Sequence, residues 1–492
     1  MSKRLRILAL VVAMVVLALA LGNLGAHSGR RAALRNYVAE LKGKGERLTY
    51  AELEIARLTN SSDSHAVVAN TALLIKGGPV TPGLVEVRSY VAPGRALVAW
   101  QQPSPISGKS NTWEELDAQM QASDSAFQEV RDALKTPSAD AGPYTNMFVG
   151  RRVNFVAIRI VAQWLTAAAE NDLHRGRLEA ALQKIEALAG LSNMERDEPT
   201  LVAQMIRVAV AGLGLAVTWE ALQAPGWSDP HLDRLQKAWE RVDMAGALER
   251  GFEGARASGY ELFTRTRHLN GPQVGRLLAG TSPPSSTPAY INVANSFRDY
   301  IYIPLYKLTS LDQDELFYLR NMQEGLTALR QAKAHRPWAE TRQRLNQVNS
   351  NVTAMAGSPQ RVRYLFSTIC IPNYLKACDT GMNNETERQM ALAAIALKRF
   401  QLRHGELPAT LEGLVPDFLP ALPYDYMAAR PLRYARKADG TYLLYSVGRD
   451  GQDDGGDPQP APGLSNGIWS GRDAVWPRPA AAAGGQSRPS TH

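Results

Sequence analysis

Apolar residues recur at helical spacing through the middle of the chain. Between Val153 and Leu165 they stand three or four positions apart, with Arg152 and Arg159 on the opposite side. The same spacing returns from Leu178 to Ala189, after a turn at residues 174–176. This pattern predicts two amphipathic helices, each of which buries one face.

Residues 208–217 are apolar on all sides and are closed by Arg207 and Glu220. They are too few to cross a membrane, so we expect a helix at the centre of a folded domain. Capping-box spacing at residues 49–52 and 112–115 marks two helix starts. Further helices are predicted at about 31–44, 112–134, 230–249, 312–335 and 338–352.

The predicted fold class is therefore mainly α, with an irregular helical bundle as the body. An alternative is tetratricopeptide-like stacking, because residues 168–188 resemble one helix-turn-helix unit of that kind. Such stacking requires several units of about 34 residues, and the sequence shows no second clean copy.

A different apolar run stands at the N-terminus. Lys3, Arg4 and Arg6 precede residues 7–26, which carry no charge. About 20 apolar residues cross a bilayer as a helix, and a basic flank stays in the cytoplasm. We expect a single-pass bacterial inner-membrane protein with its body in the periplasm. The alternative is a signal peptide cleaved after residues 18–20 (Ala-Leu-Ala), which leaves a periplasmic or secreted body.

The C-terminal region mixes helix and strand signals. A helix predicted over 387–403 ends before Gly405, and Thr410 begins a short helix through Leu414. Residues 432–436 and 442–447 read as two strands of a hairpin, because the dipeptide at 439–440 (Asp-Gly) favours a tight turn.

Breaks in composition divide the chain into seven parts. Residues 281–288 are a Ser- and Pro-rich linker, and the last residues are rich in Ala, Gly, Ser and Pro. The predicted parts are a membrane anchor or signal peptide (1–30), a helix and irregular segment (31–111), a helical domain (112–280), a linker (281–290), further helices (291–386), a small α+β module with an antiparallel sheet (387–477) and a disordered tail (478–492).

The order of motifs in this C-terminal module resembles that of the type II secretion major pseudopilins. Residues 391–414 (ALAAIALKRFQLRHGELPATLEGL), 431–457 (PLRYARKADGTYLLYSVGRDGQDDGGD) and 471–477 (GRDAVWP) carry the resemblance. The whole chain resembles bacterial membrane-anchored envelope proteins with such a tail. The pseudopilin processing site is missing at residues 6–7, and over 350 residues separate the anchor from the module, so pseudopilin filament packing is not expected.

The resemblance implies a calcium ion in the acidic, glycine-rich loop. The matching oxygen donors are Asp450, Asp453, Asp454, Asp457 and Asp473. Calcium takes six to eight oxygen ligands, and clustered carboxylates are suited to it. A solvated acidic turn without an ion is the alternative.

Composition narrows the possible chemistry. The net charge is +8, but the basic residues are scattered and form no motif that reads nucleic acid, so no nucleic-acid partner is expected. The two cysteines, Cys370 and Cys378, exclude a four-thiolate zinc site, and they either form one disulfide or stay free. Glu249, Arg250, Glu253 and Arg256 are spaced for helical ion pairs on a solvated face, with a catalytic carboxylate pair as the alternative.

No catalytic motif stands out among the dispersed histidines or around the serines and glycines. The leading hypothesis is a non-enzymatic membrane-anchored envelope protein with a scaffold, assembly or secretion-related interaction role, whose partners are the bilayer, through residues 7–26, and other envelope proteins. The alternatives are an enzyme of unrecognised family with a cleft between the helical body and the C-terminal module, and a peptide- or glycan-binding helical-repeat protein.

Overall fold

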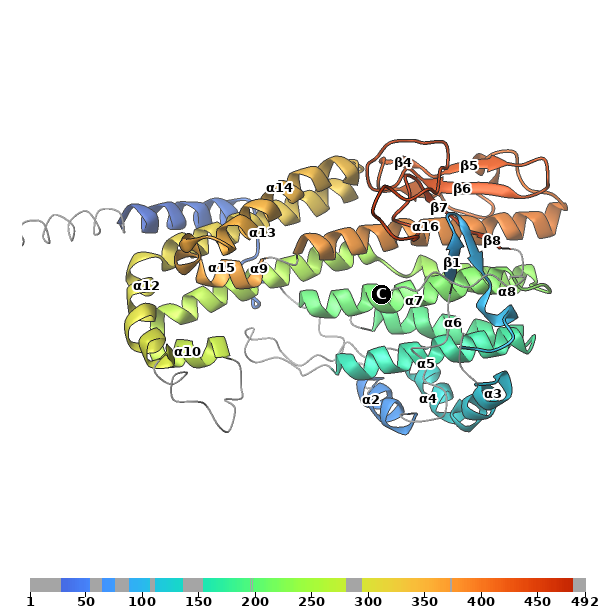
Figure 1. The fold of residues 1–492 in the computed structure, drawn as a ribbon, viewed down its shortest axis with the longest axis horizontal. Coiled ribbons are helices and arrows are strands. Elements are labelled where there is room, and N and C mark those ends of the chain that lie inside the picture. The colour runs from blue at the N-terminus through green and yellow to red at the C-terminus, as the bar shows by residue number, and fades with distance from the viewer. Residues whose placement is uncertain are drawn as a thin grey trace, which may run out of the picture.

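The computed structural model describes residues 28–53, 64–75, 88–106, 111–135, 154–194, 196, 198–279, 294–371 and 374–480. The predicted membrane anchor at 7–26 and the linker at 281–290 lie outside the described residues. Most long helices run along the long axis of the molecule, and the small sheets gather at one end (Figure 1). The mainly α prediction is confirmed, with small sheets that are largely antiparallel.

Helix 28–43 opens the described chain. The helices that follow in the first half are α2 (Ser64–Leu74), α3 (Trp113–Ala122), α4 (Asp124–Lys135), α5 (Phe155–His174), α6 (Leu178–Asn193), α7 (Leu201–Leu222), α8 (Asp229–Glu240), α9 (Met244–His268) and α10 (Gly271–Ala279). The second half contains α12 (Ile303–Thr309), α13 (Leu311–Lys333), α14 (Trp338–Ala356), α15 (Leu365–Cys370) and α16 (Tyr374–His404).

Short elements join these helices. A π-helical turn, η3 (Arg298–Tyr302), runs directly into α12, and 3₁₀ turns form η2 (Ala99–Gln101), η4 (Pro359–Arg363) and η5 (Leu411–Leu414). The strands are β1 (Ser89–Ala92), β2 (Arg95–Leu97), β3 (Tyr424–Asp425), β4 (Arg430–Pro431), β5 (Arg433–Arg436), β6 (Tyr442–Ser446), β7 (Ala474–Val475) and β8 (Arg478–Pro479).

Local sequence signals place several of these elements correctly. The capping box before α3 is formed, since Thr112 Oγ1 accepts the Glu115 amide at 3.2 Å and Glu115 accepts the Thr112 amide at 3.1 Å. The predicted hairpin is the β5–β6 pair, in which residues 433–436 oppose 442–445. The helix predicted over 230–249 is instead two helices, α8 and α9, broken at residues 241–243.

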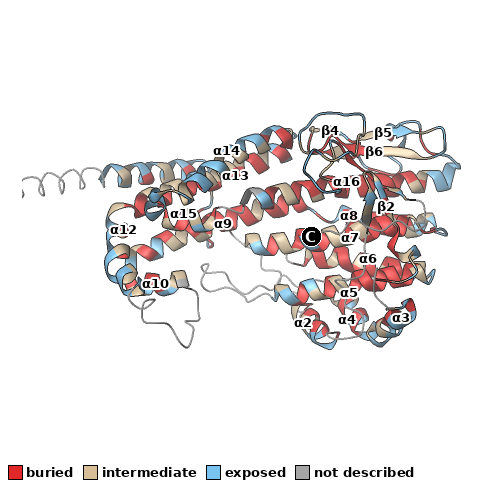
Figure 2. Cartoon of the chain, viewed as in Figure 1, coloured by how far each residue is buried: buried red, intermediate tan, exposed pale blue. Residues whose placement is uncertain are grey.

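The predicted central helix is α7, and its Val208, Ala211 and Leu215 are fully buried. In the described part of the chain, α7 is the one helix long and apolar enough to cross a membrane. Its apolar window is 56% buried inside the protein, as in a core helix. Figure 2 shows buried residues gathered along α7, α9 and α16 and exposed ones on the outer helices.

Helix α16 ties the C-terminal module to the helical body. Its Cys378 and Met382 belong to one apolar core with α9 and α13, and its residues 390–397 belong to another with α7, α8 and the module. The domain boundary predicted between 386 and 387 therefore falls inside a continuous helix.

Two sequence predictions are corrected. The segment 31–111, predicted as one helix and irregular chain, also contains α2 and the β1–β2 hairpin. The disordered tail predicted from 478 begins with β8, which pairs in parallel with β2. The Arg478 amide donates to Gly94 O at 2.9 Å, and Trp219 Nε1 donates to Pro477 O at 2.8 Å. The residues that pair here are far apart in the sequence, so no local pattern predicts the contacts.

Candidate functional site

The acidic loop lies between two strands of one sheet. It leaves β6 after Ser446 and returns at Asp473, directly before β7, and β6 and β7 are antiparallel neighbours. Because both ends of the loop meet at one sheet edge, Asp473 comes close to the run that starts at Asp453.

Asp473 closes the loop by accepting hydrogen bonds from backbone amides. It is buried, and its carboxylate accepts the amides of Gly456 at 2.7 Å, Asp457 at 3.1 Å and Asp454 at 3.4 Å. Burial raises the pKa of Asp473 even though these three amides favour its ionised form. Gly456 has a φ of 81°, a conformation that a residue with a side chain rarely adopts.

The other carboxylates of the loop are directed at cations or at local amides. Asp453 accepts Arg433 Nε at 2.8 Å and the Tyr445 hydroxyl at 3.0 Å. The hydrogen bond from Arg433 lowers the pKa of Asp453. Asp457 pairs with Arg472 at 3.2 Å, and Asp450 accepts the Gln452 amide at 3.1 Å. Asp454 is exposed.

In this arrangement the aspartates of the loop face other groups of the protein and not one common centre. Within the described part of the chain, no three His, Cys, Asp or Glu side chains are placed to hold a metal. Calcium takes six to eight oxygens, and here Asp453 and Asp457 face guanidinium groups while Asp473 faces amides. Calcium binding stays a prediction that requires the loop to give up its pairs with Arg433 and Arg472.

A groove of about 340 Å³ separates helix α14 from the C-terminal module beside this loop. Two backbone hydrogen bonds hold its sides together, from Trp338 N to Tyr426 O at 2.9 Å and from Ala339 N to Met427 O at 3.4 Å. The charged residues that line it are Glu340, Arg430, Arg433, Asp450 and Asp453. Acidic and basic side chains lie side by side in the groove, so it suits a partner surface that is polar.

A larger open hollow, of about 560 Å³, lies among α4, α6 and α8. Arg234 on its wall is already paired with Glu186 at 2.7 Å and with Glu179 at 2.9 Å, and Lys135 is paired with Asp132 at 2.7 Å. A hollow lined by helices is what the peptide- or glycan-binding alternative requires. Because Arg234 and Lys135 are already paired with carboxylates of the protein, they are less available to bind a charged ligand.

Both cysteines are free thiols in the structure. Cys370 ends α15 and is partly buried, while Cys378 lies on α16 and is fully buried. Burial raises the pKa of Cys370 to about 11 and that of Cys378 well above its usual value. In both cases burial disfavours the thiolate that nucleophilic chemistry needs.

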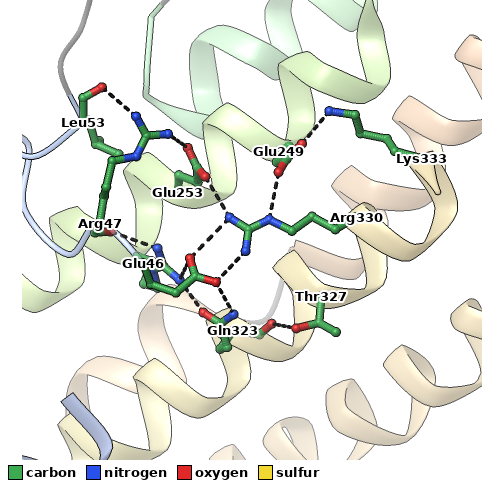
Figure 3. A network of polar contacts seen from close by, with 10 residues as sticks. Glu46, Arg47, Leu53, Glu249, Glu253, Gln323, Thr327, Arg330 and Lys333 are labelled. Carbon is green, nitrogen blue, oxygen red and sulfur yellow. Dashed lines mark hydrogen bonds and ion pairs between the residues drawn. The ribbon is translucent and has the colours of Figure 1, made fainter. Parts of the chain in front are cut away.

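The predicted solvated face of α9 is covered by a partly buried ion-pair network (Figure 3). Arg330 of α13 reaches three carboxylates, Glu46 at 2.5 Å and Glu249 and Glu253 at 2.8 Å each. Arg256 is fully buried and bonds Glu46 at 2.9 Å. Interpretation of these residues as a solvated face is therefore wrong, because a helical spacing pattern cannot show that another helix covers them.

The network holds the segment that follows helix 28–43. Burial opposes ionisation of Glu46, but hydrogen bonds from Arg330 and Gln323 and the charge of Arg256 lower its pKa to about 2. The next residue, Arg47, pairs with Glu253 at 2.9 Å, and its carbonyl accepts Arg256 Nη2 at 2.8 Å. Residues 46–47 are thereby joined to both α9 and α13.

Glu170 is a second buried ionisable group, and no motif in the sequence marks it. Glu170 of α5 is fully buried, and its carboxyl oxygens have no hydrogen-bond partner among the described residues. Burial and the neighbouring Glu220 raise the pKa of Glu170 well above its usual value. Glu220 accepts the amides of Ala99 and Arg88 at 2.9 and 2.8 Å. In the sequence, the one signal of this burial is the run Ala-Ala-Ala-Glu at 167–170, directly after the predicted apolar face.

The chain matches no family model, no curated protein and no solved structure to which it was compared.

Proposed function

We propose that this chain is a membrane-anchored bacterial envelope protein with an interaction role. In this proposal residues 7–26 span the inner membrane, the helical body lies on the periplasmic side, and the C-terminal module contacts other envelope proteins. Should the apolar run be cleaved as a signal peptide, the same body is periplasmic or secreted. The pseudopilin-like character of the module belongs to this proposal.

The ion-pair network of Glu46 and Arg47 is the observation that carries the proposal. The apolar run ends at Ala26, and helix 28–43 follows it almost at once. That helix packs Leu34 into the core formed by α9 and α13, and the network fastens its end. An anchor followed by a packed helix, rather than by a loose tether, is expected to hold the body in a set orientation.

The position of the C-terminal module supports a contact role. Helix 28–43 lies at one end of the molecule, and the sheet of β5 and β6 lies at the other (Figure 1). The groove between α14 and the module therefore stands away from the expected membrane end. Its mixed charges, from Arg430 and Glu340 among others, are typical of the polar rim of a protein interface.

The experiment is photo-cross-linking in intact cells. A photoreactive amino acid replaces Ala428 in the groove or, as the matched control, Gln183 in the α4–α6–α8 hollow. We expect defined cross-links to envelope proteins from Ala428, and their loss when Arg430→Glu and Glu340→Lys reverse the groove charges. Equal cross-linking from both sites, or unchanged cross-linking after charge reversal, contradicts the proposal.

The enzyme alternative has one observation in its favour, which is the position of the groove between the helical body and the C-terminal module. Its carboxylate Asp453 has a lowered pKa, which suits a fixed negative charge better than proton transfer near neutral pH. Turnover of a small-molecule substrate that Asp453→Asn abolishes, with folding unchanged, would favour the enzyme.

A further inference from the structure

The helix formed by η3 and α12 has one apolar face that no described part of the chain covers. Its inner side chains, Ile303 and Tyr306, are buried in the core. Its outer side, together with Phe297 in the helical turn directly before η3, carries large apolar residues, each more than half exposed, at helical spacing: Phe297, Tyr300, Ile301, Leu305 and Leu308. Figure 2 shows this exposed outer side of α12 at the end of the molecule.

Exposed apolar residues are concentrated here. Fourteen large apolar residues are exposed in the described chain, and five of them fall between positions 297 and 308. A sixth, Val362, is joined to the same surface because the Tyr302 hydroxyl donates to its carbonyl at 2.7 Å. A clustered apolar surface on a folded protein marks a binding site, whereas single exposed residues do not.

The sequence outside the described residues indicates what covers this face. Arg30, four residues after the apolar run ends at Ala26, donates a hydrogen bond to the carbonyl of Thr309, the last residue of α12. Four residues extend at most about 14 Å whatever their conformation. If residues 7–26 span a bilayer, the end of α12 lies close to the layer of lipid headgroups.

The composition of the face suits that layer. A helix that lies in the interface buries apolar side chains about 5–10 Å into the boundary between headgroups and acyl chains. Tyrosine, here Tyr300, favours this depth because its ring is apolar and its hydroxyl is polar. Arg361 and Arg363 flank Val362 and are exposed, so they complement anionic headgroups.

We propose that the outer face of η3 and α12 lies in the headgroup layer of the membrane and forms a second, interfacial contact beside the anchor. This inference rests on the proposed membrane anchor. It adds that the body itself contacts the bilayer along residues 297–308, so that the anchor is not its sole attachment to the membrane.

The test uses the full-length protein reconstituted into vesicles of phosphatidylethanolamine and phosphatidylglycerol. A photoreactive phenylalanine analogue replaces Leu305 or, as the control, Leu402, a similarly exposed residue near the end of α16. That end of α16 lies far from α12 (Figure 1). Tyr300 and Leu464 form a second matched pair, in case one substitution disturbs folding.

We expect several-fold more lipid adducts from Leu305 and Tyr300 than from their controls. Equal yields at both members of each pair overturn the inference, and so do cross-links that run to a second copy or to another segment of the chain. Flotation of the vesicles separates the two proposals. Protein that floats without lipid adducts at residue 305 refutes only the interfacial contact, whereas protein that does not float refutes the anchor as well.

Discussion

Glu46 and Arg330 form an ion pair, 2.5 Å between Oε1 and Nη1, that joins the segment after the first helix to α13. The Glu46 side chain is 9% exposed and that of Arg330 is 35% exposed, so the carboxylate is shielded from water and the guanidinium only partly. Removal of one partner from a buried pair is costly because the other charge stays buried without compensation. The free energy that this contact contributes therefore measures how firmly the segment after the expected anchor is held to the body.

Replacement of Arg330 tests that strength. Arg330→Ala leaves Glu46, Glu249 and Glu253 without their shared cation, and we expect a loss of about 2–4 kcal/mol of unfolding free energy. Arg344→Ala, which breaks an exposed pair with Glu324, is the control, with an expected loss under about 1 kcal/mol. Urea unfolding of the purified full-length protein measures both. Equal effects would show that the network is no stronger than a surface pair.

The pH dependence of stability gives a second test of Glu46. Its pKa is about 2 in the folded state and near its ordinary value when unfolded, so its contribution is present above pH 5. The contribution is lost as the pH falls through about 2. We expect Glu46→Gln to be less stable than the native protein at pH 7, by about 2 kcal/mol after allowance for solvent screening, and the difference to shrink towards pH 3. A difference that does not change with pH would contradict this role.

The contribution of buried Glu170 to stability depends on pH in the opposite direction to that of Glu46. Its pKa is raised in the folded state, so its contribution is fully present below the unfolded pKa and is lost as the pH rises towards the folded value. We expect Glu170→Gln to match the native protein near pH 4 and to exceed its stability at pH 8 by at least about 1 kcal/mol. Urea unfolding at both values checks this, with the exposed Glu129→Gln as control. A variant that is less stable at pH 8 would show that the carboxylate makes a favourable contact.

Calcium has a direct thermal test. Asp473 and the pairs of Asp453 and Asp457 already hold the acidic loop, so a loop that keeps these contacts gives the same melting temperature in chelator and in excess calcium. An ion that binds only the folded state would raise the melting temperature with its concentration. A rise that Asp453→Ala abolishes would show that the loop rearranges around calcium, as the resemblance to pseudopilins implies.

Local patterns in the sequence predicted the elements but not the long-range contacts. Apolar spacing located α5, α6 and α7, and Asp439–Gly440 located the β5–β6 hairpin, because these signals act within a few residues. The pairing of β2 with β8 joins residues more than 380 positions apart, and neither short strand has a distinct pattern of its own.

The same limit applies to the candidate sites. The sequence grouped the aspartates of the acidic loop but could not show that Arg433 and Arg472 pair with them. Glu249 and Glu253 have the spacing of surface residues, and only the packing of α13 on α9 reveals their buried side. The exposed face of η3 and α12 was also missed, since helical spacing predicts an apolar stripe without showing whether it is covered.

The central claim is that residues 7–26 hold the body at the periplasmic face of the membrane. The most direct measurement is alkaline extraction of cell membranes, followed by protease treatment of spheroplasts. We predict that the full-length chain stays with the bilayer, that external protease degrades its body, and that deletion of residues 7–26 abolishes membrane retention. A full-length chain found freely soluble in the cytosol would contradict the account.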